Sequence, residues 1–199
     1  TNMAGFLAKK LYGIPHVITA HSLEPMRPWK AEQLGGGYRV SGWAEQTAYE
    51  NADAIIAVSH AMRQDILRAY PQVAPERVHV IHNGIDIDKW QRTAPGSELQ
   101  NRLCDAYGID PSQPIVAFVG RITRQKGLTR LLRAAESVDP KAQLLICAGA
   151  ADTAELGEEV AELIAQLRQR RTGVVHIEQM LPHEELVALL SLATVFVTP

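Results

Sequence analysis

The chain has 199 residues, a formal net charge of −2, and 46% hydrophobic against 21% charged residues. These shares are those of a globular protein that can bury a substantial core, and no apolar run approaches the length of a membrane span. Because the charge is close to neutral, nothing at the level of the whole chain indicates nucleic acid or a membrane as a partner.

The two cysteines, Cys104 and Cys147, are expected to pack in a helix and in a buried strand. Their separation fits neither a metal site nor a redox motif. Free cysteines favour a reducing compartment, and residues 1–12 lack the layout of a signal peptide. We therefore expect a cytoplasmic protein. Both ends look severed, since residues 1–12 resemble a helix already under way and 194–199 a strand reaching its loop, so we interpret the sequence as an internal segment.

The first part of the chain alternates short apolar runs with helical segments. The expected elements are a helix over 1–12, a strand over 16–20, a helix over 38–51, a strand over 53–58, a helix after Ser59 and a strand over 77–81. Ser59 is placed to cap the helix that follows it. Asn83-Gly84 is expected to form a turn that ends the last strand.

A polar stretch over 93–97 indicates a connection between domains, after which the pattern restarts. Ser97 is placed to cap the next helix and Gly108 to end it. The expected elements are helices over 98–107, 128–138, 153–171 and 182–192, and strands over 115–119, 143–148, 174–177 and 194–199.

Continuous apolar strands alternating with helices are typical of parallel sheets covered on both faces. The sequence therefore predicts the α/β class, with two doubly wound parallel-sheet domains of the Rossmann type, both incomplete. We place the first domain over 1–86 and the second over 87–199.

Ligands of open parallel sheets bind outside the carboxyl ends of the strands, and three such ends carry polar residues here: 19–22, 81–86 and 120–127. In the third, Gly120 permits a tight turn, and Arg121 and Lys126 stand beside a helix N-terminus whose free amides favour anions. Arginine and lysine both suit phosphate oxygens. The loop is thus a candidate diphosphate site, and the alternative is a merely solvated basic loop.

A resemblance to a known family supports the phosphate interpretation. Val-Gly-Arg-Ile-Thr-Arg-Gln-Lys-Gly at 119–127 resembles the donor-phosphate loop of retaining glycosyltransferases with the GT-B architecture, the large family that includes bacterial glycogen and sucrose synthases. His-Val-Ile-His-Asn-Gly-Ile-Asp at 79–86 is similar to the interdomain segment of that family, and Ala-Val-Ser at 57–59 to the strand end before it. These segments follow in the family's order, and the resemblance covers essentially the whole chain.

A more particular resemblance lies at 19–38, Thr-Ala-His-Ser-Leu-Glu-Pro-Met-Arg-Pro-Trp-Lys-Ala-Glu-Gln-Leu-Gly-Gly-Gly-Tyr. This segment is similar to the loop of actinobacterial glycogen synthases, which belong to glycosyltransferase family 4. They include enzymes that join ADP-glucose to glucose 1-phosphate and make maltose 1-phosphate. The resemblance therefore implies a hexosyltransferase of this type.

The resemblance also implies roles for individual residues. Arg121 and Lys126, with Gly120, would hold the donor pyrophosphate, and His21 would face the transferred sugar from the opposing domain. The remaining candidates are less specific: Arg27 and Lys30 either meet an anionic acceptor or lie in a solvated loop, Trp29 is a candidate for stacking on a sugar ring, and Asn83 is a candidate substrate contact that more plainly shapes the interdomain turn. No carboxylate cluster indicates a metal, and the family works without a metal or another cofactor.

The expected reaction is a retaining transfer of glucose from ADP-glucose, or another nucleoside-diphosphate sugar, to an α-1,4-glucan or to glucose 1-phosphate. The expected partners are therefore the nucleotide-sugar donor and a glucan or sugar-phosphate acceptor, and a homodimer stays open. Two alternatives remain, a sugar-nucleotide epimerase of the same architecture and a non-catalytic nucleotide-sugar-binding module. The 199 residues alone are expected to be inactive, because the family's glycine-rich loop and glutamate pair fall outside them.

Overall fold

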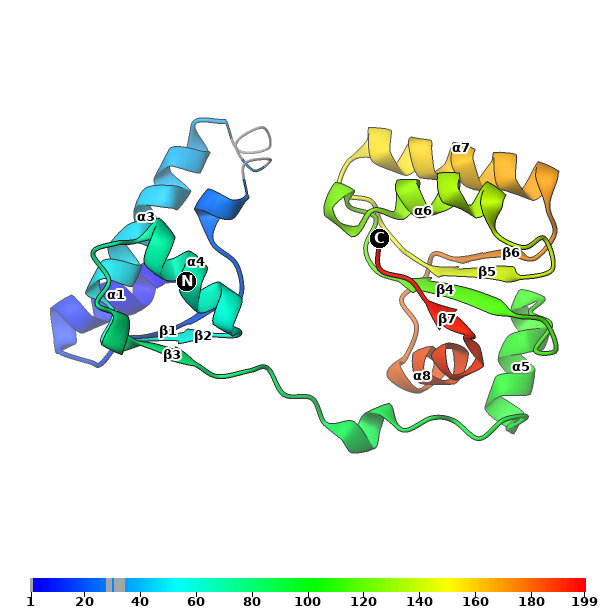
Figure 1. The fold of residues 1–199 in the computed structure, drawn as a ribbon, viewed down its shortest axis with the longest axis horizontal. Coiled ribbons are helices and arrows are strands. Elements are labelled where there is room, and N and C mark those ends of the chain that lie inside the picture. The colour runs from blue at the N-terminus through cyan, green and yellow to red at the C-terminus, as the bar shows by residue number, and fades with distance from the viewer. Residues whose placement is uncertain (1, 28–29, 31–34) are drawn as a thin grey trace. The chain divides into compact units, whose positions relative to one another are not determined.

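The computed structural model describes residues 2–27, 30 and 35–199, and Figure 1 shows its ribbon. The chain divides into two compact units, Thr1–Ile85 and Asp86–Pro199, called unit 1 and unit 2 below. Each unit contains one parallel β-sheet with helices packed against it. No helix in the described part of the chain is both long and apolar enough to cross a bilayer.

Unit 1 is built around a three-stranded parallel sheet with the order β1-β2-β3. Its elements in chain order are α1 (Asn2–Tyr12), β1 (Val17–Ala20), η1 (Glu24–Met26), α3 (Gly37–Asn51), β2 (Ala54–Ala57), α4 (His60–Ala69), η2 (Pro75–Arg77) and β3 (Val78–Val80). The strands and helices predicted here are confirmed within one or two residues at most ends.

The core of unit 1 lies on one face of its sheet. Ile18 and Ile55 point from β1 and β2 into a buried cluster that also contains Tyr49 of α3 and Ile66 of α4. On β1 buried residues alternate with exposed ones, and Val17 on the opposite face is 54% exposed. In the described part of unit 1, only one set of alternating side chains on β1 and β2 is therefore fully buried.

Unit 2 is built around a four-stranded parallel sheet with the order β6-β5-β4-β7. Its elements in chain order are η3 (Ile87–Trp90), α5 (Glu98–Tyr107), β4 (Ile115–Val119), η4 (Arg124–Lys126), α6 (Leu128–Ala134), η5 (Ala135–Ser137), β5 (Gln143–Cys147), α7 (Ala154–Arg170), β6 (Val174–Ile177), α8 (His183–Leu192) and β7 (Val195–Phe196). The chain runs outward from β4 through β5 to β6 and then returns to β7 on the other side of β4.

Both faces of the sheet of unit 2 are covered, as the sequence predicts. Figure 1 shows α6 and α7 over one face and α5 and α8 over the other. Successive residues of a strand point to opposite faces, so Phe118 and Ile146 join the cluster under α6 and α7, whereas Ala117 and Leu145 join the cluster under α5 and α8.

Helix boundaries in unit 2 follow the predicted capping residues. The hydroxyl of Ser97 accepts a hydrogen bond from Gln100 N at 3.3 Å, and Gly108 ends α5 in the left-handed conformation with φ +64°. One helix is shorter than expected: α6 ends at Ala134 and continues as the 3-10 helix η5.

The connection between the units differs from the expectation in two ways. Residues 81–86, including Asn83 and Gly84, are irregular and form no turn. The stretch over 93–97 is not a free connector, since Thr93 N donates to Ser191 Oγ at 3.0 Å and Arg92 donates to the Ser191 carbonyl at 2.8 Å. These bonds hold the stretch against α8, so it belongs to unit 2.

Both cysteines are free and packed, as predicted. Cys104 points from α5 into the core, and Cys147 is half-buried at the end of β5. Burial raises the pKa of the Cys147 thiol to about 11, so this thiol stays protonated near neutral pH and is a poor nucleophile.

Candidate functional site

The loop after β4 lies where the strand order of unit 2 reverses. β4 is the first strand of the sheet in sequence, with β5 on one side and β7 on the other. This reversal is the topological switch point, where the carboxyl ends of neighbouring strands diverge and leave room for a ligand. The basic segment 120–127 predicted from the sequence therefore stands at the position where an open parallel sheet binds its ligand.

Two glycines of this loop, Gly120 and Gly127, occupy positions where a side chain would crowd neighbouring residues. A Cβ on Gly120 would lie 3.3 Å from the Phe118 ring and 3.9 Å from Lys126 Cγ. Gly127 adopts φ +67°, and a Cβ there would lie 3.0 Å from Pro199 Cβ. Gly127 therefore lets the loop after β4 pass directly beside Pro199, in the segment that follows β7.

Arg121 and Lys126 are both presented to solvent from this loop. The Arg121 side chain is 77% exposed and lies 3.6 Å from the Asp152 carboxylate, an ion pair that the sequence alone does not predict. Lys126 is exposed, and its backbone N–H is fixed by the hydroxyl of Thr123 at 3.2 Å. The backbone of the loop is thus ordered, while both cationic groups can reach a ligand.

The loop after β5 is joined to this basic loop. Ile122 and Ala151 form an isolated parallel bridge, and Asp152 N donates to the Ile122 carbonyl at 3.1 Å. A Cβ on Gly149 would lie 2.7 Å from the Glu178 carbonyl oxygen, so only glycine fits there. The loop after β4 is therefore braced by the loop after β5, and its cations Arg121 and Lys126 suit an anionic group.

In unit 1, His21 follows the carboxyl end of β1 and is exposed. It lines a polar cavity of about 360 Å³ together with Ser22, Glu24, Arg27 and Ser41. The candidate residues His21 and Arg27 are thus brought to one cavity of unit 1, and Arg121 and Lys126 to one loop of unit 2.

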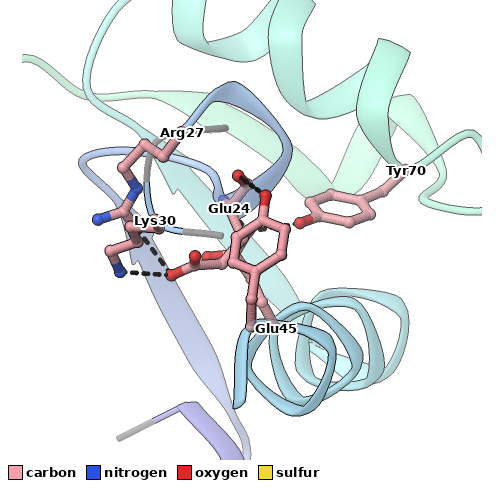
Figure 2. A network of polar contacts seen from close by, with 6 residues as sticks. Glu24, Arg27, Lys30, Glu45 and Tyr70 are labelled. Carbon is pink, nitrogen blue, oxygen red and sulfur yellow. Dashed lines mark hydrogen bonds and ion pairs between the residues drawn. The ribbon is translucent and has the colours of Figure 1, made fainter. Parts of the chain in front are cut away.

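Arg27 and Lys30 form ion pairs with a buried carboxylate that is not among the residues predicted from the sequence. Arg27 Nη2 lies 3.1 Å and Lys30 Nζ 2.8 Å from the same oxygen, Glu24 Oε1 (Figure 2). Glu24 is 5% exposed. The sequence predicts that Arg27 and Lys30 either meet an anionic acceptor or lie in a solvated loop. The structure adds a third feature, because both side chains belong to an ion cluster around the buried Glu24. The spacing Glu-x-x-Arg-x-x-Lys, with two residues between successive charges, is the signal in the sequence that indicates such contacts.

The ionised state of Glu24 follows from these contacts. Burial disfavours the charged carboxylate, but the hydrogen bond from Lys30 and the charges of Arg27 and Lys30 outweigh burial and hold the pKa of Glu24 below its ordinary value. The nearby Ser41 hydroxyl acts in the same direction. Glu24 is therefore an anion across the neutral range.

Two further residues hold the Glu24 segment in place. Glu45 Oε1 on α3 accepts hydrogen bonds from the backbone N–H of Glu24 at 2.7 Å and from the Tyr70 hydroxyl at 2.5 Å. The Tyr38 hydroxyl donates to the Glu24 carbonyl at 2.7 Å. Burial and the neighbouring Glu45 carboxylate raise the pKa of Tyr70 above its ordinary range, which keeps its hydroxyl a donor.

The remaining candidate residues make few contacts or lie outside the described part of the chain. Asn83 is exposed in the irregular segment between β3 and η3, and Trp29 lies outside the described residues. His82, at the end of unit 1, places Nδ1 3.2 Å from the Val58 carbonyl oxygen. In the described part of the chain no cluster of three or more His, Cys, Asp or Glu side chains has the arrangement of a metal site.

Two family models match the chain, and together they span nearly all of it. The model described as Glycosyltransferase Family 4 matches residues 1–89, and the model described as Glycosyl transferases group 1 matches residues 100–199.

Relatives of known name are similar over the whole chain. An alpha-maltose-1-phosphate synthase of Mycolicibacterium smegmatis is 56% identical over 199 residues, which is 100% of this chain and 51% of that protein. An alpha-maltose-1-phosphate synthase of Mycobacterium tuberculosis is 54% identical over 202 residues, again 100% of this chain and 51% of that protein. The chain thus spans about half the length of the curated relatives it matches.

A solved structure shows the same fold. A sucrose-phosphate synthase of Thermosynechococcus elongatus is similar with a TM-score of 0.76 and 24% identity, covering 99% of this chain and 47% of that chain. At this identity the likeness concerns the fold alone. The predicted α/β class, with two Rossmann-like parallel-sheet domains of the GT-B type, is confirmed.

Proposed function

The chain belongs to the glycosyl transferases group 1 family, and on that premise we propose that the protein containing it is a retaining hexosyltransferase. It moves glucose from ADP-glucose to glucose 1-phosphate and forms maltose 1-phosphate. Identities of 54% and 56% to two alpha-maltose-1-phosphate synthases support this acceptor over an α-1,4-glucan. The nucleotide sugar and the sugar phosphate are accordingly its partners, and two free cysteines support a cytoplasmic location.

The observation that carries the proposal is the exposed pair of cations, Arg121 and Lys126, in the loop after β4. This loop lies at the topological switch point of unit 2 and contains Gly120 and Gly127, at which a side chain would crowd its neighbours. Unit 2 is assigned to the donor on this ground. The guanidinium of Arg121 and the ammonium of Lys126 bind the diphosphate and neutralise the charge that grows on it as the bond to glucose breaks. Such preorganised groups accelerate a reaction because they stabilise the transition state more than the ground state.

Unit 1 is assigned to the acceptor. Arg27 and Lys30 bind the acceptor phosphate, and His21 donates or accepts a hydrogen bond at a hydroxyl of the transferred glucose and orients its anomeric carbon. The acceptor hydroxyl attacks from the side that the diphosphate leaves, so the anomeric configuration is retained without a covalent enzyme intermediate. Asn83 makes a further contact with the substrate in this proposal.

The test uses the complete protein with ADP-glucose, UDP-glucose and GDP-mannose as donors, each against glucose 1-phosphate and glycogen. We expect ADP-glucose and glucose 1-phosphate to give the highest kcat/KM, with maltose 1-phosphate as product. Conversion of the sugar within the donor, without an acceptor, would establish an epimerase instead. Donor binding without turnover on either acceptor would establish a non-catalytic module.

A further inference from the structure

A buried carboxylate lies beside the cavity at the carboxyl end of β1 and is only half used by its neighbours. Glu24 is 5% exposed and lines this cavity of about 360 Å³. Its Oε1 atom receives both Arg27 and Lys30, whereas its Oε2 atom makes no close hydrogen bond among the described residues. The Ser41 hydroxyl lines the same cavity and contributes a weaker interaction that lowers the pKa of Glu24. A buried oxygen of an ionised carboxylate that lacks a donor is costly, so the arrangement calls for a donor from elsewhere.

The segment around Glu24 cannot easily turn to satisfy this oxygen. Its backbone N–H is bound to Glu45, its carbonyl is bound by Tyr38, and Tyr70 holds Glu45 from behind. Figure 2 shows the Glu24 side chain between the cations on one side and the Glu45 and Tyr70 side chains on the other. The orientation of the carboxylate is therefore set before any ligand arrives.

The two cations also keep donors in reserve. Arg27 gives one Nη2–H to Glu24, and its Nε–H is buried without a partner among the described residues. Lys30 carries three N–H donors, of which one meets Glu24. One small region thus offers a carboxylate oxygen that accepts and two cationic groups that donate.

This combination fits a ligand that carries both hydroxyl and phosphate groups. A phosphate oxygen accepts from arginine and lysine, and a sugar hydroxyl donates to a carboxylate. A neutral glucan supplies hydroxyls but no anion for the two cations, and inorganic phosphate supplies the anion but no hydroxyl on a ring. A sugar phosphate satisfies both parts at once.

We propose that Glu24 binds the sugar-phosphate acceptor: Oε1 positions Arg27 and Lys30 for the phosphate, and Oε2 accepts a hydrogen bond from a hydroxyl of the sugar. The inference rests on the proposed function and deepens it, because it assigns the residue that selects a phosphorylated acceptor. Glu24 is not among the residues that the sequence resemblance implies for the reaction.

The experiment measures binding of glucose 1-phosphate and of glucose to the complete protein by calorimetry, with initial rates beside it. Glu24→Gln keeps the shape of the side chain but removes its charge. We expect it to weaken glucose 1-phosphate binding and raise the acceptor KM by about tenfold or more, the size of a lost charge-assisted hydrogen bond. The KM for ADP-glucose stays within about twofold of wild type, since the donor is bound elsewhere.

Two further variants separate binding from folding. Tyr70→Phe disturbs the same buried network from outside the cavity, so it lowers Tm but raises the acceptor KM less than Glu24→Gln does. Lys30→Met alters a half-exposed residue that does not threaten the core, and it weakens binding of glucose 1-phosphate but not of glucose.

Unchanged binding of glucose 1-phosphate in Glu24→Gln, or an equal loss in Tyr70→Phe, would overturn the inference. Failure of the proposed function looks different. If the wild-type protein binds glucose 1-phosphate through Glu24 but transfers no glucose, the site stands and the reaction is wrong. If wild type and Glu24→Gln both transfer glucose with the same acceptor KM, the proposed reaction is correct and the proposed role of Glu24 is wrong.

Discussion

The loops after β1 and after β4 use the same two residue types in opposite ways. After β4, Arg121 and Lys126 are exposed, and the ion pair of Arg121 with Asp152 is long, at 3.6 Å. After β1, Arg27 and Lys30 share one oxygen of a carboxylate that is 5% exposed. The cations after β4 are thus accessible to the phosphates of a ligand, whereas the cations after β1 are already held by a buried carboxylate.

The largest effect is expected in the loop after β4. Arg121→Ala or Lys126→Ala in the complete protein should lower kcat by about a hundredfold or more, because each removes a group that stabilises the leaving diphosphate. Steady-state rates with ADP-glucose and glucose 1-phosphate measure the effect. Arg124→Ala is the matched control, because Arg124 is an exposed arginine of the same loop without an assigned role, and it should change kcat by less than about threefold. Equal losses in all three variants would reduce the loop to a general basic surface.

The second prediction concerns the support of the loop after β1. Tyr70→Phe removes the donor that lies 2.5 Å from Glu45 Oε1 and should lower the free energy of unfolding by about 1.5–3 kcal/mol, the usual loss for a hydrogen bond to a charged group. Denaturant unfolding monitored by circular dichroism measures it. Loss of less than about 0.5 kcal/mol would mean that the network does not hold this loop.

Gly127→Ala tests how closely the loop after β4 depends on its backbone. A Cβ is sterically unfavourable at φ +67°, and here it would also lie 3.0 Å from Pro199 Cβ. The free energy of unfolding should therefore fall by about 1–2 kcal/mol, and kcat should fall with it. Gly108→Ala provides the comparison, since Gly108 has φ +64° with no atom within 4 Å of the added Cβ. We expect that variant to lose stability but retain wild-type kcat; a fall in kcat for both would point to a global cause.

The smallest effect is expected at the ion pair between the loops after β4 and β5. Asp152→Asn should change the free energy of unfolding by no more than about 0.5 kcal/mol, because exposed ion pairs contribute little. Freed from its carboxylate, Arg121 should bind the donor at least as well, which a KM titration with ADP-glucose checks. A large rise in that KM would show that Asp152 positions Arg121.

Much of the fold could be predicted because the signals are local. The apolar run over 115–119 becomes β4 without a shift, and Ser59 caps α4 by accepting from Met62 N at 3.0 Å. The failures involve context. Asn83-Gly84 has a turn-forming composition, but a turn forms only if the chain must reverse, and here it continues toward η3 instead.

The residues of the candidate site also differ in how far the sequence predicts them. The basic loop after β4 is contiguous in sequence, so its residues could be found together. The surroundings of Glu24 could not, because Glu45 lies 21 residues away on α3 and Tyr70 lies a further 25 residues along the chain, after α4. Only the packing of these helices against one face of the sheet brings a second buried glutamate to the backbone of the first.

The central claim is that Arg121 and Lys126 bind the second phosphate of the donor nucleotide. The most direct measurement is the affinity of the complete protein for ADP and for AMP, in wild type and in Lys126→Ala, by calorimetry. We predict that wild type prefers ADP by about tenfold or more, as expected for a charge-assisted contact to the additional phosphate, and that the variant loses most of this preference. A ratio of ADP to AMP affinity that is the same in both proteins would contradict the account.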